Sequence, residues 1–277
     1  MDNVHYILSI AGSDSCGGAG MQADIKTATC LGCHCCTVFV VLTAQNTKEV
    51  KSFYEIDEKF ITEQLDSIFT DVHISVIKLG VLYSRKVINL ICNYIKDINN
   101  KRDEKLLVVF DPVFVSASGY LLVENMDYVK YILKMICPIT KIITPNIHEF
   151  KLILKAVDYE GDIENTNMIE LFKIFMDKLN IDACIFKSCN IGENVENENK
   201  LYAVDHLCIR KIKDETNQTT KEENENDIEN RNKHFLYDVY KMTSDRLPEL
   251  DVHGTGCTLS SAIACFLAKK NDLVTSC

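Results

Sequence analysis

The chain has 277 residues, of which 47% are hydrophobic and 25% charged, with a formal net charge of −10 and a pI of about 5.2. An acidic chain is a poor partner for nucleic acid or anionic membranes, and no apolar run approaches the roughly 20 residues that a membrane helix needs. Chains of this length can form one α/β domain, and the absence of a basic leader predicts a cytoplasmic location.

Apolar strands alternate with amphipathic helices along the chain, which predicts a mainly parallel sheet with helices on both faces. We expect strands at 6–10, 38–42, 76–79, 107–110, 142–144 and 183–186. We expect helices at 59–69, 85–98, 127–136, 147–157 and 168–179, where apolar residues recur every three or four positions. Ligands of such sheets bind beyond the carboxyl ends of the strands.

A glycine-rich loop follows the first predicted strand and precedes a helix start. Gly12 and Gly17 have the spacing of a P-loop, but Gly-Ala follows where that motif requires Lys and then Ser or Thr. A P-loop is therefore excluded.

The same loop also matches the dinucleotide-binding fingerprint at Gly18, Gly20 and Ala23. That fingerprint needs an acidic residue at the end of the next strand, and here the strand ends in the neutral residues around Gln45. A Rossmann-type oxidoreductase is therefore disfavoured.

The stretch 251–261 reads as a tight turn that opens a helix. Unpaired amides and the positive end of the helix dipole would form an anion site there. Cys257 lies in the first turn, so we expect a lowered thiol pKa and a role as a base or nucleophile. The alternative interpretation is a small-residue helix start that packs tightly on a neighbour.

Thirteen cysteines are too many, and an odd number, for complete disulfide pairing, so we expect reduced thiols. Cys30 to His34 fit the Cys-x-x-Cys-His pattern of covalent haem attachment. They also lie where a tight helix-to-strand turn is expected at Gly32, and no second Cys-x-x-Cys completes a zinc site. Buried small hydrophobic residues are the favoured interpretation.

Two further segments are interpreted without a ligand. The stripe of Phe172, Phe175, Met176 and Leu179 has core spacing rather than that of a cofactor site. The polar stretch 210–233 is predicted to be a disordered insertion between two late strands of a single domain spanning 1–277.

Taken together, these segments resemble the ribokinase-like superfamily, and within it the hydroxymethylpyrimidine/phosphomethylpyrimidine kinases of thiamine biosynthesis. The matching segments occur in family order at 10–14, 17–27, 43–47, 64–69, 111–113, 144–146 and 253–262. The resemblance implies a three-layer α/β fold with a mainly parallel central sheet. It also implies ATP and Mg²⁺ as cofactors, a homodimer, and phosphorylation of 4-amino-5-hydroxymethyl-2-methylpyrimidine and its monophosphate.

The resemblance assigns catalytic roles around the 253–262 segment. Cys257 takes the place of the aspartate base of most sugar kinases in the superfamily, and would accept the proton of the substrate hydroxymethyl group. The amides of Gly254, Thr255, Gly256 and Cys257 would form the anion hole for the transferred phosphoryl group.

Four residues at other predicted strand ends would handle the metal and the phosphates. By resemblance, Asp111 is the metal-associated acid, and Asn146 and Glu149 organise magnesium and phosphates through water. Lys187, at the end of a strand, would meet the nucleotide phosphates, as would Gly256.

For the acceptor, Asp24 and Gln45 could read the amine and ring nitrogens of an aminopyrimidine. The resemblance adds backbone from Gly12 and packing from Val113, and places Val81 where bacterial relatives often carry methionine.

Two rival functions stay open at this point. Pyridoxal kinases act on a similar hydroxymethyl-bearing ring but usually keep Asp at the position of Cys257. A non-catalytic homologue would bind the pyrimidine without turnover. Only 20 residues follow Cys257, whereas relatives usually continue with further helix, so part of the adenine pocket is expected to lie outside this sequence.

Overall fold

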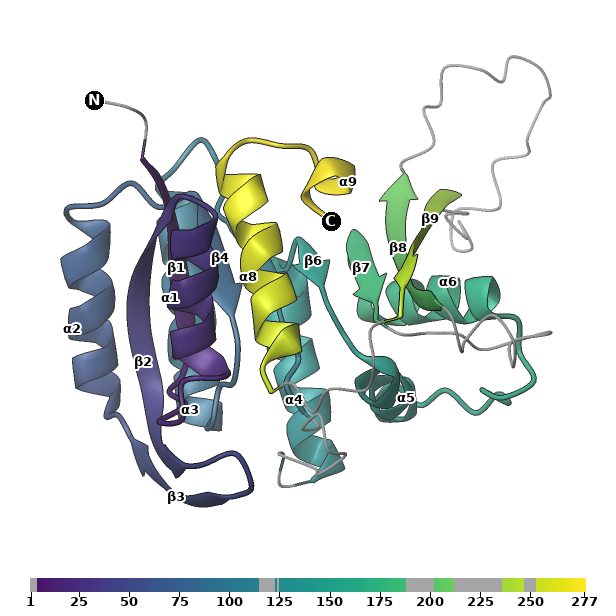
Figure 1. Ribbon diagram of the computed structural model, residues 1–277, viewed down its shortest axis with the longest axis horizontal. Helices are drawn as coiled ribbons and strands as arrows, with labels where there is room; N and C mark the ends of the chain where they lie inside the picture. Colours follow the sequence, from purple (N-terminus) through teal and green to yellow (C-terminus); the bar gives the residue numbers. More distant parts are fainter. Residues whose placement is uncertain (1–3, 115–122, 124, 188–201, 212–235, 247–252) are drawn as a thin grey trace, which may run out of the picture.

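The computed structural model describes residues 4–114, 123, 125–187, 202–211, 236–246 and 253–277. Strands in this part of the chain form one sheet in the order β3-β2-β1-β4-β5-β6-β7-β8-β9 (Figure 1). Their bounds are β1 His5–Gly12, β2 Cys33–Gln45, β3 Val50–Glu55, β4 Val76–Leu79, β5 Leu107–Phe110, β6 Ile142–Ile143, β7 Ala183–Phe186, β8 Tyr202–Lys211 and β9 Leu236–Asp245. The six adjacent strands β2, β1, β4, β5, β6 and β7 pair in parallel, whereas β3, β8 and β9 pair antiparallel at the two edges.

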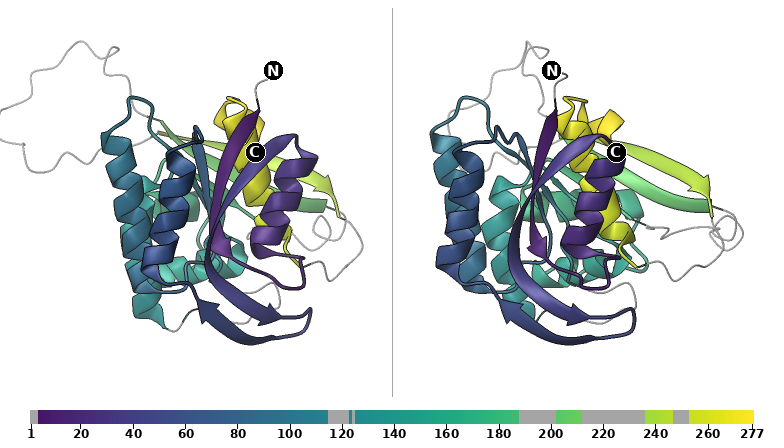
Figure 2. Two further views of the ribbon diagram at one scale, coloured as in Figure 1. Left: turned by 90° about the vertical axis from the view of Figure 1, so that its left-hand side faces the viewer. Right: turned by 60° about the vertical axis from the view of Figure 1, so that its left-hand side comes forward.

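Helices cover both faces of this sheet (Figures 1 and 2). Their bounds are α1 Gly20–Cys30, α2 Glu58–Phe69, α3 Arg85–Asn100, α4 Met126–Ile136, α5 Ile147–Ala156, α6 Met168–Leu179, α8 Thr255–Ala268 and α9 Leu273–Ser276, with a 3₁₀ turn at Cys137–Ile139. Helices α2 to α6 pack on one face, and α1 and α8 lie side by side on the other. The predicted three-layer α/β fold is confirmed.

Alternation along the central strands explains why one sheet supports two cores. In β4, Val76 belongs to the core under α1 and α8, whereas its neighbour Ile77 belongs to the core under α2 to α6. Val108 and Val109 in β5 divide in the same way. Successive side chains of a strand point to opposite faces, so a continuous apolar run fills both layers.

The sequence pattern predicted the central strands and missed β3, and it gave no bounds for the two late strands that flank the predicted insertion, β8 and β9. All six residues of β3 are exposed, so this strand lacks the apolar pattern that identified the others. The predicted insertion at 210–233 begins too early, because Arg210 and Lys211 belong to β8. The Arg210 side chain donates to Asn180 Oδ1 and to the carbonyl of Met176, both at 2.7 Å, which ties β8 to the end of α6. Residues 212–233 of that prediction lie outside the described part of the chain.

The Cys30–His34 segment forms the turn between α1 and β2. Gly32 has φ +68°, in the left-handed region that favours glycine, as the predicted tight turn requires. Cys33 is buried and its thiol donates to the carbonyl of Cys265, whereas Cys30 is exposed. All twelve cysteines in the described residues are free thiols. None of the helices described here is long and apolar enough to cross a membrane.

The parallel strands place the loops that carry the predicted site residues. Strands β1, β4, β5, β6 and β7 all end at one edge of the sheet, and α1 and α8 both begin at that edge (Figures 1 and 2). Two helix N-termini therefore point toward the same region.

Four phenylalanines form the aromatic centre of the core beneath α5 and α6. The ring of Phe172 stacks on that of Phe186 with 3.9 Å between centroids, and Phe150 and Phe175 contact the same ring of Phe186 edge-on. All four side chains are fully buried, which confirms that the stripe on α6 is core.

We expect Phe172→Ala to lower the free energy of unfolding by about 3–5 kcal/mol, because it removes buried contacts and leaves a cavity. Denaturation by guanidinium chloride measures the loss. The control is Ile169→Ala in the same helix, where the side chain is 46% exposed and the expected change is within about 0.5 kcal/mol. Equal effects of the two substitutions would contradict this account of the core.

Candidate active site

The start of α8 packs directly against the glycine-rich loop between β1 and α1. Gly254 has φ +88°, and a Cβ atom there would lie 1.8 Å from the carbonyl oxygen of Gly18. Only glycine allows the two backbones to come this close. The first amides of α8 are therefore held against the loop that precedes α1.

A buried aspartate that the sequence analysis did not select holds the glycine-rich loop in shape. The Asp14 carboxylate accepts hydrogen bonds from the N–H groups of Cys16, Gly18 and Ala19 at 2.8–3.0 Å. The signal for this role was present in the sequence, since an Asp at the start of a loop commonly bonds the amides that follow it.

His253 connects this loop to the end of β2. Its Nε2 lies 3.4 Å from Asp14 Oδ2 and 3.0 Å from Gln45 Nε2. The backbone of Gln45 is fixed through Ser15, whose hydroxyl both donates to the Gln45 carbonyl and accepts from its N–H. Gln45 is thereby held at the mouth of the region that the two helix starts face.

Cys257 lies in the first turn of α8 and is 8% exposed. The N–H of Gly20, the first residue of α1, donates to its sulfur, so both helix starts converge on this thiol. Burial, assisted by the nearby carboxylates of Asp111 and Asp24 and opposed by Lys78, nevertheless raises the pKa of Cys257 to about 11. The expected lowering of the thiol pKa is therefore wrong for the resting protein, because desolvation of the thiolate outweighs the helix start and the opposing charge of Lys78.

The structure brings Asp111 and Lys187 together beside the start of α8. The buried Asp111 carboxylate accepts from Lys187 Nζ at 3.3 Å and from the hydroxyls of Thr144 and Ser260 at 3.1 and 3.3 Å. A Cβ on Gly256 would lie 3.1 Å from Lys187 Nζ, so this glycine leaves room for the ammonium.

Glu149 lies in the same cluster through the first turn of α5. Its side chain accepts from the N–H of Asn146 at 2.9 Å while Asn146 Oδ1 accepts from the N–H of Glu149, so the pair forms a capping box. Burial, and then the charge of Asp111, raise the pKa of Glu149 to about 8, against the effect of Lys187. The buried carboxylates of Asp111 and Glu149 thus share one positively charged neighbour, the ammonium of Lys187.

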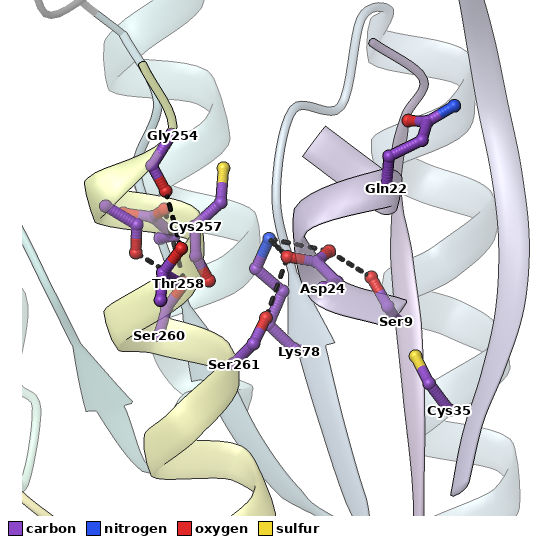
Figure 3. Close-up of polar contacts among 12 residues, drawn as sticks. Ser9, Gln22, Asp24, Cys35, Lys78, Gly254, Cys257, Thr258, Ser260 and Ser261 are labelled. Atoms are coloured by element: carbon purple, nitrogen blue, oxygen red, sulfur yellow. Dashed lines mark hydrogen bonds and ion pairs between the residues drawn. The ribbon is translucent and has the colours of Figure 1, made fainter. Parts of the chain in front are cut away.

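Asp24 does not lie where the sequence analysis placed it. Its carboxylate is fully buried and accepts from Ser9 at 2.5 Å, from Ser261 at 2.7 Å, and from Lys78 Nζ at 2.9 Å through both oxygens (Figure 3). All of its acceptor positions are occupied by protein, so direct contact with a pyrimidine amine is contradicted. Lys78 was missed, although a lysine within the apolar run Val76–Leu79 indicates a buried charge that needs a partner.

Two of the other predicted acceptor residues line a small pocket. Val81 and Val113 line a pocket of about 50 Å³ together with Phe110 and Phe114. Gly12 ends β1, where a Cβ would lie 2.8 Å from Val41 Cγ1. A larger pocket of about 360 Å³, lined by residues 69–74 and the end of α3, lies at the opposite edge of the sheet.

No group of three or more His, Cys, Asp or Glu side chains arranged to hold a metal ion occurs in the described residues. Near Lys187 the structure places two buried carboxylates, those of Asp111 and Glu149. Mg²⁺ commonly binds through one or two carboxylates and completes its shell with water and substrate phosphates. The donor set is consistent with such an ion.

Comparisons with known proteins identify relatives of this chain in sequence and in fold. A putative hydroxymethylpyrimidine/phosphomethylpyrimidine kinase of Schizosaccharomyces pombe is 34% identical over 96% of the chain, but the match covers 44% of that protein. The chain thus spans less than half the length of this curated relative. A crystal structure of phosphomethylpyrimidine kinase from Clostridium difficile matches 99% of the chain and 94% of its own, with a TM-score of 0.69 and 28% identity.

A pyridoxal kinase of Bacillus subtilis, solved as an ADP complex, has the same TM-score of 0.69 at 22% identity, covering 99% of this chain and 87% of that one. This second likeness shows the shared fold. The family model for phosphomethylpyrimidine kinase matches residues 14–234 and 218–277, which together include nearly the whole chain. Because this match extends over far more than half of its length, the chain belongs to the phosphomethylpyrimidine kinase family.

Proposed function

We propose that this protein transfers a phosphoryl group from ATP to the hydroxymethyl group of 4-amino-5-hydroxymethyl-2-methylpyrimidine, and to the phosphate of the resulting monophosphate, in thiamine biosynthesis. The observation that carries the proposal is the convergence of two helix N-termini on Cys257, beside a buried cluster of two carboxylates and one ammonium. Phosphoryl transfer to an alcohol needs an anion site, charge neutralisation and a proton acceptor, and this arrangement supplies all three.

The amides at the start of α8 would receive the transferred group. The first N–H groups of a helix have no partner within the helix, so those of Thr255, Gly256 and Cys257 are donors for anionic oxygens. Lys187 lies next to Gly256 and would contact the nucleotide phosphates. The thiolate of Cys257 would accept the hydroxyl proton of the substrate.

Mg²⁺ would be held by Asp111 and Glu149, with Asn146 nearby as the capping partner of Glu149. The raised pKa of Glu149 supports this assignment, because a buried carboxylate destabilised by a neighbouring carboxylate is stabilised by a cation. When bound, the ion would offset the charge that develops on the phosphates.

The acceptor ring would lie between Gln45 and the pocket of Val81 and Val113, near the end of β1 at Gly12. Gln45 can both donate to and accept from the edge of an aminopyrimidine. Asp24 would not contact the ring. Its buried carboxylate would support the site through the side chains that are hydrogen-bonded to it.

We expect the wild-type protein to phosphorylate hydroxymethylpyrimidine and its monophosphate with higher kcat/KM than pyridoxal, in an assay that couples ADP formation to NADH oxidation. Gln45→Leu removes hydrogen bonds to the ring and should lower kcat/KM for the pyrimidine about tenfold, with a smaller loss for pyridoxal. The control is the thermal midpoint of the variant, which should be unchanged because the Gln45 side chain is partly exposed. Equal or higher efficiency with pyridoxal in the wild type would assign the protein to vitamin B6 salvage instead.

The pKa of Cys257 generates a prediction about pH. A thiol with a pKa of about 11 is mostly protonated at neutral pH, so kcat/KM should rise about tenfold per unit from pH 6.5 to 8.5 as the thiolate fraction grows. Cys257→Asp places a group there that ionises at lower pH, so its profile should be flat over this range. Cys257→Ala should lose about 10²–10⁴-fold in kcat. A rate for Cys257→Ala close to wild type would show that Cys257 is not the base.

We also infer that two copies associate through β3. This strand is the edge of the sheet, and its aromatic residues Phe53 and Tyr54 are exposed. Exposed edges of this kind pair readily with another strand. An antiparallel pair of β3 strands centred on Phe53 would set Lys51 of one copy opposite Glu55 of the other, twice, which favours this register.

Charge reversal tests the inferred dimer. Lys51→Glu should raise the dimer dissociation constant about tenfold, because it sets like charges opposite each other in both pairs. The double variant Lys51→Glu/Glu55→Lys should restore it. Sedimentation velocity over a concentration series measures the dissociation constant, and a monomeric wild type at every concentration would rule the association out.

A further inference from the structure

Lys78 is a buried charge that the proposed transfer steps do not use. It lies in β4, its side chain is wholly inaccessible to solvent, and it is among the largest side chains that the described residues bury to this degree. A buried ammonium is costly unless its charge is paired and its N–H groups are bonded. Its position in the sheet therefore needs an explanation.

The pairing of Lys78 joins four elements of the site. Lys78 Nζ donates to both oxygens of Asp24 at 2.9 Å, and the same carboxylate accepts from Ser9 in β1 and Ser261 in α8. A Cβ on Gly80 would lie 3.1 Å from Nζ, so the chain leaves room for the ammonium there. The charge is thus held in one place between α1 and α8.

This fixed charge lies beside the first turns of α8 and acts on Cys257. Cys257 and Ser261 are four residues apart in α8 and therefore lie on the same face of the helix. Figure 3 shows the ammonium of Lys78 between Asp24 and the turns of α8 that carry Cys257 and Ser261. The charged groups that act on Cys257 are Lys78 from β4, Asp24 from α1, Asp111 after β5 and Lys187 after β7.

Lys78 keeps its charge in this setting. Burial by itself disfavours the ammonium, but Asp24, Cys257 and Asp111 outweigh it and raise the pKa of Lys78 above its ordinary value. Among the charges that act on Cys257, Lys78 has the largest effect and lowers the thiol pKa, whereas the two aspartates raise it less.

We propose that Lys78 is a positioning residue whose buried ammonium, anchored by Asp24, stabilises the thiolate of Cys257. The thiol loses its proton to solvent, the thiolate then takes the proton of the acceptor hydroxyl, and Lys78 stays protonated throughout. The kinetic consequence rests on the proposed function, whereas the ionisation of Cys257 does not.

The test measures the ionisation of Cys257 directly. Iodoacetamide reacts with thiolates, so its rate with Cys257 at pH 8.5, read from the Cys257 peptide by mass spectrometry, reports the thiolate fraction. We expect Lys78→Met to slow this reaction about tenfold, the effect of roughly one pKa unit. Lys78→Met/Asp24→Asn removes both charges and should slow it only a few-fold, because the opposing carboxylate is lost as well.

The double variant also covers the case in which Lys78→Met does not fold, since replacing a whole buried ion pair is often tolerated. The matched control is Ser261→Ala, which removes a hydrogen bond from the same network without a charge and should change the rate by less than about twofold. Cys92, buried at the opposite side of the sheet, provides an internal reference in every sample.

An unchanged or faster rate in the double variant would overturn the role of Lys78. A slower rate cannot result from loosening of the site, because loosening speeds alkylation. Steady-state kinetics on the same variants examine the proposed function separately: kcat should fall with the alkylation rate while KM for the pyrimidine stays the same. Slower alkylation with unchanged kcat would leave the thiolate effect intact and exclude Cys257 as the base.

Discussion

The buried ion pair of Lys78 and Asp24 is the interaction on which the arrangement of the site depends. It joins a central strand to α1, and the hydroxyls of Ser9 and Ser261 extend it to β1 and α8. Removing one partner would leave an uncompensated charge in the core, which typically lowers the free energy of unfolding by about 3–5 kcal/mol. The two helices are therefore held in the relative position that brings both of their N-termini to Cys257.

The site contains more buried carboxylates than buried ammonium groups. Lys78 is matched by Asp24, but Lys187 is shared between Asp111 and Glu149. Burial, together with this excess of carboxylates, raises the pKa of Glu149 to about 8, so at neutral pH the protonated form of Glu149 is favoured over a second negative charge beside Asp111. Under the proposed function, a cation bound with the nucleotide phosphates would supply the missing positive charge.

Cys257 shows how burial and local fields compete at one atom. The N–H of Gly20 at the start of α1 and the ammonium of Lys78 favour the thiolate, but the loss of water around the sulfur outweighs them and leaves a protonated thiol in the resting protein. Close packing contributes to this balance, because Cys257 is only 8% exposed where α8 begins against the glycine-rich loop.

The sequence by itself determined the central strands and helices, because buried parallel strands and amphipathic helices have distinct apolar periods. It also determined that Asp111, Asn146, Glu149, Lys187 and Cys257 lie at one edge, since the carboxyl ends of parallel strands meet there. Only the tertiary structure decided that Asp24 faces Lys78 and not a ligand, that Asp14 holds the glycine-rich loop, and that burial raises the pKa of Cys257. These outcomes depend on contacts between residues far apart in the chain, such as Asp24 with Ser261, and no local pattern encodes the degree to which such contacts exclude water.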